Sequence, residues 1–405
     1  MKIAILSIGN ELLSGDTINT NAGWIGRKLT EIGCDIFQQI TVPDKKVPIS
    51  NALNQLIDLN PDFIICTGGL GPTEDDITRQ TLFDFAGTES KFDQDYWDAL
   101  SVRFKRFGMD IPESNRNQAL VPVDGDVIQN PVGSARGSKF NVKDTTLISL
   151  PGVPAEMKAM MTESIIPLIH QKGLKPKSFR TLRTTGIPES AMIEKITPAT
   201  DKDHGCEIGY YPSLFGVDIR ISHAESQPVD SLSKDLYRIL DVSIYGEGKE
   251  SIEEVIIQLA KNKNKTISTA ESCTGGLIGH RLTEVSGSSD VYKGGLVVYS
   301  NESKMSMLGV EKDILEAHGA VSEETAESMA RNVINKFGSD YGISVTGIAG
   351  PTGGTDEKPV GLIYIGLAKK GHVKVKEFHF GTNRKRNKLR TSQAALNWLR
   401  LSLLS

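Results

Sequence analysis

The chain has 405 residues, of which 39% are hydrophobic and 24% are charged, and its formal net charge is −4. This composition is typical of a soluble globular protein and excludes a disordered chain or an extended coiled coil. With a slight acidic excess, the chain lacks the net positive charge that would attract nucleic acid or an acidic membrane, so neither is expected as a partner. A chain of this length should fold as roughly two to four domains.

The four cysteines, Cys34, Cys66, Cys206 and Cys273, lie far apart and form no CxxC pair. This spacing argues against structural zinc and against a disulfide framework, so a reducing compartment is expected. The N-terminal apolar run ends in Gly-Asn-Glu rather than in a small-residue cleavage site. No apolar stretch reaches the roughly 18 to 20 residues that a membrane span needs. We therefore expect a cytoplasmic protein.

The first third of the chain alternates strands and helices. Apolar runs predict strands at residues 2–9, 35–42, 62–69 and 146–154. Between the first three, apolar residues recur at helical spacing: Ala22, Ile25, Leu29 and Ile32, then Ile49, Leu53, Leu56 and Ile57. This βαβ order predicts a doubly wound sheet, and a first domain, over residues 1–170.

In the rest of the chain, the composition and the pattern of predicted elements change twice. Lysine, glycine and proline cluster at residues 171–179, and a small α+β module is expected over residues 171–248. Residues 249–405 restart with a helix and again alternate strands and helices. The predicted fold class is α/β, with two separate three-layer α/β domains joined by the small α+β module.

Two segments of the first domain follow predicted strands, at the edge where open parallel sheets bind ligands. Residues 9–21 contain Asn19, and residues 67–79 contain the three glycines Gly68, Gly69 and Gly71. Glycines let backbone amides approach a phosphate closely. Two further turns, NPVGSARG with Gly133 and LPGVPAEM, could line the same cleft, although each could also be only a loop.

Three consecutive acids, Glu74, Asp75 and Asp76, lie beside those glycines. Carboxylates next to a phosphate cradle can hold a hard divalent cation that neutralises the phosphate. The alternative is that the acids only occupy the first turn of a helix, where they favour its dipole, and that the glycines form a tight turn.

In the last domain, the stretch AESCTGG places Ser272 and Cys273 side by side between a predicted strand and a predicted helix. Unpaired amides at a helix N-terminus could stabilise an oxyanion there. A plain helix cap is the alternative. Either residue could be a nucleophile, so a cysteine amidase that uses Cys273 is a rival mechanism to a serine amidase.

A base for the serine is expected from another strand end. Tyr299 ends a strand and Lys304 begins a helix five residues later, so both could face one pocket. A lysine with a lowered pKa, or a tyrosine beside it, can serve as the base where no histidine is available. The seven histidines are scattered, which argues against a Ser-His-Asp triad.

Two more segments of this domain suggest substrate contacts. Residues 344–361 form a strand followed by a glycine-rich turn, in which Gly347, Ile348, Ala349 and Gly350 could line a pocket for a phosphate or an amide. Residues 380–390, FGTNRKRNKLR, offer arginines for a phosphate, although a basic helix surface is the commoner explanation.

The segments IGNELLSGDTINTN, TGGLGPTEDDITR and LPGVPAEM resemble the molybdopterin-binding fold of proteins such as MoaB and, more specifically, the N-terminal domain of the CinA competence- and damage-inducible family. That resemblance implies a metal-dependent ADP-ribose pyrophosphatase. Glu74, Asp75 and Asp76 would hold Mg²⁺, Mn²⁺ or Co²⁺, and the glycine turns would cradle the diphosphate. The middle module is similar to the family's KH-like domain but lacks the GxxG loop that grips RNA, so a structural or dimerising linker is favoured.

AESCTGG, GGLVVYSNESK, HGAVSEE and SVTGIAGPTGGTDEKPVG resemble the CinA C-terminal domain, also found alone as a nicotinamide mononucleotide (NMN) deamidase. The resemblance implies a hydrolase with an acyl-enzyme on Ser272 and no cofactor at this site. Tyr299 and Lys304 would activate the serine.

The same resemblance assigns the substrate contacts. Cys273, Thr274 and Gly275 would contact the substrate, with amides near the first two holding the oxyanion. Arg386, preferred here over Arg384 because it lies four residues before Arg390, would meet the phosphate. The family also implies a homodimer that acts in pyridine-nucleotide salvage. The alternatives are a non-enzymatic adaptor in competence or DNA recombination and a molybdopterin-binding protein.

Overall fold

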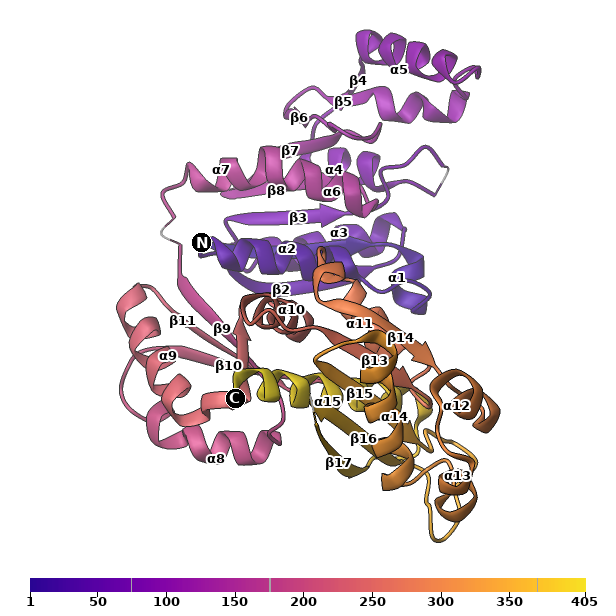
Figure 1. Cartoon of the computed structure of the whole chain (residues 1–405). Coiled ribbons are helices and arrows are strands. Elements are labelled where there is room, and N and C mark those ends of the chain that lie inside the picture. Colours follow the sequence, from indigo (N-terminus) through magenta and orange to yellow (C-terminus); the bar gives the residue numbers. More distant parts are fainter. Residues whose placement is uncertain (74, 175, 370) are drawn as a thin grey trace. The chain divides into compact units, whose positions relative to one another are not determined.

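The computed structural model describes residues 1–73, 75–174, 176–369 and 371–405 (Figure 1). The chain divides into two compact units, Met1–Lys177 and Ser178–Ser405. The predicted boundary between the middle module and the last domain falls inside the second unit. Among the described residues, we find no helix with the length and apolar character that crossing a membrane requires.

The first unit is built on a six-stranded sheet in the order β2-β1-β3-β8-β7-β6. Four strands run parallel: β1 (Lys2–Ile8), β2 (Asp35–Val42), β3 (Phe63–Thr67) and β8 (Thr145–Leu150). Two antiparallel strands extend the sheet beyond β8: β7 (Gly137–Val142) and β6 (Asp126–Ile128). The parallel strands lie close to the predicted ranges.

Alternate residues of β1 face opposite cores, because successive side chains of a strand point to opposite faces of the sheet. Ile3 packs in a cluster with residues of α2 (Thr20–Glu31) and α6 (Pro154–Met160). Ala4 packs in another cluster with residues of α3 (Lys46–Ile57). The sheet is therefore the middle of three layers.

Several short elements complete this unit: α1 (Asn10–Ser14), α4 (Thr78–Ala86), β4 (Ser90–Phe92), α5 (Gln94–Arg106), η1 (Glu113–Ala119), β5 (Leu120–Pro122), η2 (Met161–Ile165) and α7 (Ile166–His170). β4 pairs with β5 in a separate two-stranded sheet. The βαβ pattern of the sequence predicted none of β4 to β7.

The second unit begins with a small module whose four-stranded sheet has the order β10-β11-β9-β12. Its elements are β9 (Ser178–Thr184), α8 (Glu189–Thr200), β10 (Glu207–Pro212), β11 (Val217–His223), α9 (Ser226–Leu240), η3 (Asp241–Ser243) and β12 (Ile244–Glu247). Met192 of α8 and Leu236 of α9 pack with Leu182 and Ile219 of the sheet in one cluster. The module is therefore α+β, with its two helices on the sheet.

The remainder of this unit carries a five-stranded sheet in the order β14-β13-β15-β16-β17. Its strands are β13 (Ile267–Glu271), β14 (Tyr292–Val297), β15 (Tyr341–Gly347), β16 (Leu362–Lys369) and β17 (His372–His379). β13 pairs in parallel with β14 and β15, whereas β15–β16 and β16–β17 are antiparallel. The parallel strands thus share one carboxyl edge.

Helices cover both faces of this sheet. One cluster holds residues of α10 (Ile252–Asn262), α11 (Leu277–Thr283) and α15 (Arg384–Leu404). The other holds residues of α14 (Glu323–Phe337), with α12 (Asn301–Leu308), α13 (Lys312–His318) and η4 (Ser288–Asp290) completing the fold. The predicted fold class, two three-layer α/β arrangements with a small α+β module between them in sequence, is confirmed.

Candidate functional site

Three parallel strand ends bring the predicted residues of the last domain together. Ser272 directly follows β13, Tyr299 lies two residues after β14, and Gly347 is the last residue of β15. Because β13 lies between β14 and β15, these three positions share one edge of the sheet. This is the edge at which open α/β sheets bind their ligands.

The Lys304 ammonium group is directed at the serine. Its Nζ lies 3.2 Å from Ser272 Oγ, 3.1 Å from the carbonyl oxygen of Val298 and 3.3 Å from that of Tyr299. Only 1% of Lys304 is exposed, and this burial lowers the pKa of its amine. A neutral amine has two hydrogens and one lone pair. With both hydrogens donated to the two carbonyls, the lone pair can accept the serine proton.

The turn after Ser272 leaves two amides free. Ser272 N donates to Val345 O at 2.9 Å, and Gly275 N donates to Ser272 O at 3.0 Å. Within the described ranges, no backbone carbonyl accepts from the amides of Cys273 and Thr274, and the Cys273 amide contacts its own thiol sulfur. Free amides next to a nucleophile are the donors that an oxyanion hole requires.

The helix itself does not supply these amides, which differs from the sequence expectation. α11 begins only at Leu277, and the buried Glu271 carboxylate accepts from its Ile278 N at 3.0 Å and Gly279 N at 2.8 Å. The sequence did not single out Glu271. Glu271 is the last residue of β13, and by accepting from the first amides of α11 it ties the end of the strand to the start of the helix, on either side of the turn.

Cys273 differs from its neighbour in chemistry. The residue is buried, and burial raises the pKa of its thiol to about 12. The thiolate is the reactive form of cysteine, and at neutral pH this thiol stays protonated. The environment of the turn therefore favours Ser272 over Cys273 as the nucleophile.

The side chain of Tyr299 faces an arginine rather than the serine. Arg384 Nη2 donates to the Tyr299 hydroxyl at 2.7 Å, and Arg384 Nη1 donates to Gly350 O at 3.0 Å. Arg386, which the sequence favoured, is exposed and contributes only its backbone amide, to the Asn383 side chain that caps α15. Of the two competing arginines, the structure brings Arg384 to the strand ends.

Asn387 holds the loop after β15, and no sequence pattern pointed to it. It is buried, and its Nδ2 donates to Ala349 O at 2.9 Å and to Gly381 O at 2.5 Å. Gly350 has a φ of 85°, a conformation that favours glycine. Ile348 in turn pairs with the first residue of β16, through Ile348 N to Leu362 O at 2.9 Å. The Gly347–Gly350 segment is therefore fixed on both sides.

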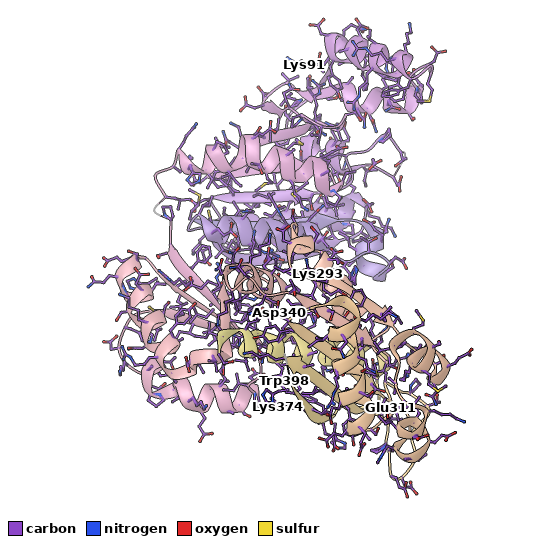
Figure 2. All side chains as sticks on the ribbon, viewed as in Figure 1. Lys91, Lys293, Glu311, Asp340, Lys374 and Trp398 are labelled. Carbon is purple, nitrogen blue, oxygen red and sulfur yellow. The ribbon has the colours of Figure 1, made fainter. Side chains whose placement is uncertain are left out.

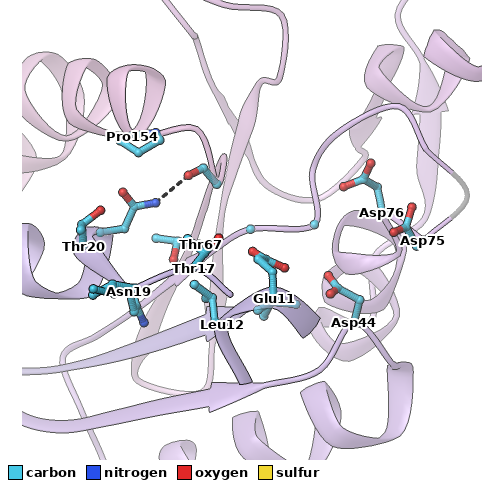
Figure 3. A pocket seen from close by; sticks show the side chains of 17 residues that line it. Glu11, Leu12, Thr17, Asn19, Thr20, Asp44, Thr67, Asp75, Asp76 and Pro154 are labelled. Carbon is cyan, nitrogen blue, oxygen red and sulfur yellow. Dashed lines mark hydrogen bonds between the residues drawn. The ribbon is translucent and has the colours of Figure 1, made fainter. Parts of the chain in front are cut away.

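The first unit has its own pocket, of about 250 Å³, at the carboxyl edge of its sheet (Figure 3). Asn19 lines it as the cap of α2, accepting from Ala22 N at 3.0 Å and donating to Ser7 Oγ at 2.8 Å. Gly68 and Gly69 also line it. Gly68 has a φ of 104°, and a Cβ there would meet Ile8 O at 2.0 Å, so only glycine fits.

Two predicted glycines lie outside that lining. Gly71 O accepts from Asn117 Nδ2 at 3.1 Å, and Gly133 N donates to Asn130 Oδ1 at 2.8 Å. The LPGVPAEM turn does reach the pocket, through Gly152 and Pro154.

Among the described residues, four acids line the pocket, and two of them belong to the predicted triplet. Asp75 and Asp76 are among them, whereas Glu74 lies outside the described residues. Glu11 and Asp44 join them, and Figure 3 shows all four carboxylates on one side of the pocket. Burial, and the charges of Glu11 and Asp75, raise the pKa of Asp44. Neither Glu11 nor Asp44 was predicted, although Asp44 follows a predicted strand.

These carboxylates supply hard oxygen ligands. Among the described residues, no three His, Cys, Asp or Glu side chains come close enough to hold an ion between them. Mg²⁺ is commonly bound by one or two carboxylates together with substrate phosphates, and the pocket can offer that donor set.

Three family models match successive parts of the chain. The "Probable molybdopterin binding domain" model matches residues 4–171, the model of the CinA KH domain matches residues 179–246, and the CinA C-terminal domain model matches residues 249–403.

Relatives match the chain over its whole length. A protein of Clostridium novyi named as a competence-damage inducible protein is 39% identical over 411 residues, covering 100% of this chain and 99% of its own. A CinA-like protein of Rippkaea orientalis is 38% identical over 419 residues, an alignment that covers 100% of this chain and 100% of that protein. The solved structure of a competence/damage inducible protein from Agrobacterium tumefaciens is 41% identical, covering 38% of this chain and 94% of its own with a TM-score of 0.37.

Proposed function

The chain belongs to the CinA family of competence-damage inducible proteins, and from this premise we propose that residues 249–405 form an amidohydrolase acting on the carboxamide of NMN. The observation that carries the proposal is the buried Lys304 amine 3.2 Å from Ser272 Oγ. A buried lysine that contacts a serine and two carbonyl oxygens has the geometry of a general base for a nucleophile.

The reaction follows from these contacts. Lys304 accepts the proton of Ser272 as Oγ attacks the carboxamide carbon, and the amides of Cys273 and Thr274 donate to the developing oxyanion. Lys304 then returns the proton to the leaving nitrogen, which departs as ammonia. Water, activated by the same amine, hydrolyses the acyl-enzyme on Ser272 to release the nicotinate nucleotide.

Arg384 is the group we assign to the substrate phosphate. Its guanidinium lies at the start of α15 and contacts Tyr299 and Gly350, beside the loop after β15. A guanidinium can bind a phosphate through two parallel hydrogen bonds, and the first amides of a helix also favour an anion. Tyr299, bonded to this arginine, would position it rather than activate the serine.

A second activity is supported by the acidic pocket of the first unit. We infer a divalent-metal-dependent pyrophosphatase that cleaves ADP-ribose, in which one or two of the carboxylates of Asp44, Asp75 and Asp76 would hold the metal together with the substrate phosphates, and Gly68 and Gly69 would face the diphosphate. The metal would supply Lewis acidity toward the phosphoryl oxygens. Asn19, held by Ser7 and Ala22, would orient the substrate from the opposite side.

One experiment tests both proposals. The protein is incubated separately with NMN and with ADP-ribose, with and without divalent metal, and ammonia and AMP are measured. We expect ammonia from NMN in either condition and AMP from ADP-ribose only with metal. A protein that turns over neither substrate but binds DNA in a salt-sensitive manner would support the adaptor alternative, and one that co-purifies with a pterin would support molybdopterin binding.

A further inference from the structure

The second unit contains a cavity of about 650 Å³ that the proposed amidase does not use. Two loops of the small module line one side, residues 185–189 and residues 212–217. β17 and α15 line the other side. Neither Ser272 nor Lys304 is among its lining residues. A volume of roughly 300 to 1,000 Å³ is usual for a site that binds a small organic molecule.

Aromatic rings dominate the cavity. Phe215 comes from the module, Phe378 and Phe380 from β17 and the residue beyond it, and Trp398 from α15 (labelled in Figure 2). The rings of Phe378 and Phe380 are stacked, with centroids 5.8 Å apart and an angle of 16° between their planes. All four side chains are only partly buried: those of Phe378, Phe380 and Trp398 pack against the hydrophobic core, and the ring surface that stays exposed lines the cavity. Such exposed ring surface can stack on a planar heterocycle such as a nucleobase.

The polar groups of the cavity favour an anion. Arg390 lines it, is exposed, and has no hydrogen bond or ion pair with any described residue. Lys376 adds a second positive charge, 4.6 Å from the ring centroid of Trp398. Asn397 uses its Oδ1 to accept from Arg400, while no acceptor in the described chain takes its Nδ2 hydrogens. Glu189 is the acidic residue of the lining.

We propose that this cavity binds a mononucleotide, with its base against the rings of Phe215, Phe378 and Trp398 and its phosphate at Arg390. A purely apolar ligand would leave Arg390 and Asn397 without partners, and a free phosphate would leave the aromatic faces uncovered. A mononucleotide offers a base to the aromatic rings and a phosphate to Arg390, and the cavity is of a size that holds such a molecule.

The cavity is connected to the proposed amidase through α15 and α11. Gln393 donates to Thr185 of the module at 3.0 Å and accepts from Arg281 of α11 at 2.7 Å. The Arg281 guanidinium also lies 4.8 Å from the ring centroid of Phe215. α15 begins at Arg384, the residue that we assign to the phosphate of NMN. A nucleotide bound between α15 and the small module would therefore contact the same helix that positions Arg384. This consequence rests on the proposed function, whereas the binding itself does not.

Trp398 provides a local probe, because the chain has three tryptophans. A full-length variant with Trp24→Phe and Trp97→Phe retains only the tryptophan that lines the cavity. We expect AMP to quench its fluorescence saturably, with adenosine and inorganic phosphate each binding at least about tenfold more weakly, since hydrogen bonds to a charged group contribute roughly 1.5–3 kcal/mol.

Further substitutions in this background locate the binding. Arg390→Ala should weaken AMP binding about tenfold or more, and Phe215→Ala should weaken both AMP and adenosine. Lys385→Ala, which removes an exposed charge from the same helix outside the cavity, should change neither. The proposal is overturned if millimolar AMP gives no saturable quenching, if adenosine binds as tightly as AMP, or if Arg390→Ala binds AMP like its parent. No turnover is needed, so failure of the amidase proposal would not affect this result.

Discussion

Lys304 sets the expected pH dependence of the proposed amidase. Only the neutral amine can take the serine proton, and burial lowers its pKa from the ordinary value of 10.5. We expect kcat/KM for NMN to rise with pH as Lys304 loses its proton and to level off below that value. The free energy of unfolding should also rise with pH between the two pKa values, because the unfolded chain binds the proton more tightly there.

The variant Lys304→Met keeps the size of this buried side chain and removes the base. We expect a loss of about 10²- to 10⁴-fold in kcat/KM, together with the loss of the pH-dependent rise. Lys312→Met, which removes an exposed lysine paired with Glu316, is the matched control and should change neither. An unaltered pH profile in Lys304→Met would show that another group is the base.

A second prediction concerns the two arginines at the start of α15, which should differ in their effect on NMN binding. Arg384→Ala should raise KM for NMN about tenfold or more, through loss of a charged hydrogen-bond partner, whereas Arg386→Ala should have a much smaller effect. The dephosphorylated nucleoside should respond little to either substitution. A larger effect of Arg386→Ala would restore the assignment made from sequence.

Sequence patterns identified the chemically reactive residues better than the residues that hold the site in place. Ser272 and Lys304 were found because a nucleophile and a base each follow a predicted strand. Asn387 was missed because its function comes from contact with a backbone atom distant in sequence, Ala349 O. Glu271 was missed because it lies inside the strand, and its function comes from accepting backbone amides seven and eight residues later. Asp44 was missed because a lone acid after a strand is also typical of a solvent-exposed turn.

At the scale of elements, α15 is the main organiser of the last domain. Its first turn supplies Arg384, and its second supplies Asn387, which holds the loop after β15. Asn387→Ala would remove the side-chain donor to the carbonyl of the buried Ala349, at a cost of roughly 1–3 kcal/mol in the free energy of unfolding. We expect kcat/KM to fall by up to about 10²-fold as the loop shifts.

Asn332→Ala serves as the control for that prediction. It removes an asparagine that donates to a backbone carbonyl, Gly309 O at 2.9 Å, on α14 instead of α15. Thermal unfolding and NMN kinetics measured on both variants separate the two effects. If both variants lose activity in proportion to stability, Asn387 has only a structural role.

The elements themselves were predictable where periodicity was strong. β2 has the predicted bounds, although it lies at the edge of its sheet and most of its residues are only half-buried. β6 and β7 were not predicted, since they lie outside the βαβ alternation: β7 pairs antiparallel with β8, and β6 pairs antiparallel with β7. α11 begins later than expected because Gly275 and Gly276 both have positive φ angles, which extend the turn after Ser272.

For the whole molecule, the two proposed activities belong to different compact units and to different chemistry. A chelator should abolish the formation of AMP from ADP-ribose and leave the release of ammonia from NMN unchanged, because only the first site would need a metal. Adding back Mg²⁺, Mn²⁺ and Co²⁺ one at a time identifies the ion. Loss of both activities on chelation would contradict the separation. The expected homodimer and cytoplasmic location stay predictions.

The most direct test of the central claim compares Ser272→Ala with Cys273→Ala in the full-length protein, with ammonia release from NMN as the readout. We predict that Ser272→Ala loses at least about 10⁴-fold in kcat, as expected when a nucleophile is removed. Cys273→Ala should retain most activity, because the proposed role of this residue lies in its backbone amide, which alanine keeps. Loss of activity in Cys273→Ala with retention in Ser272→Ala would contradict the account.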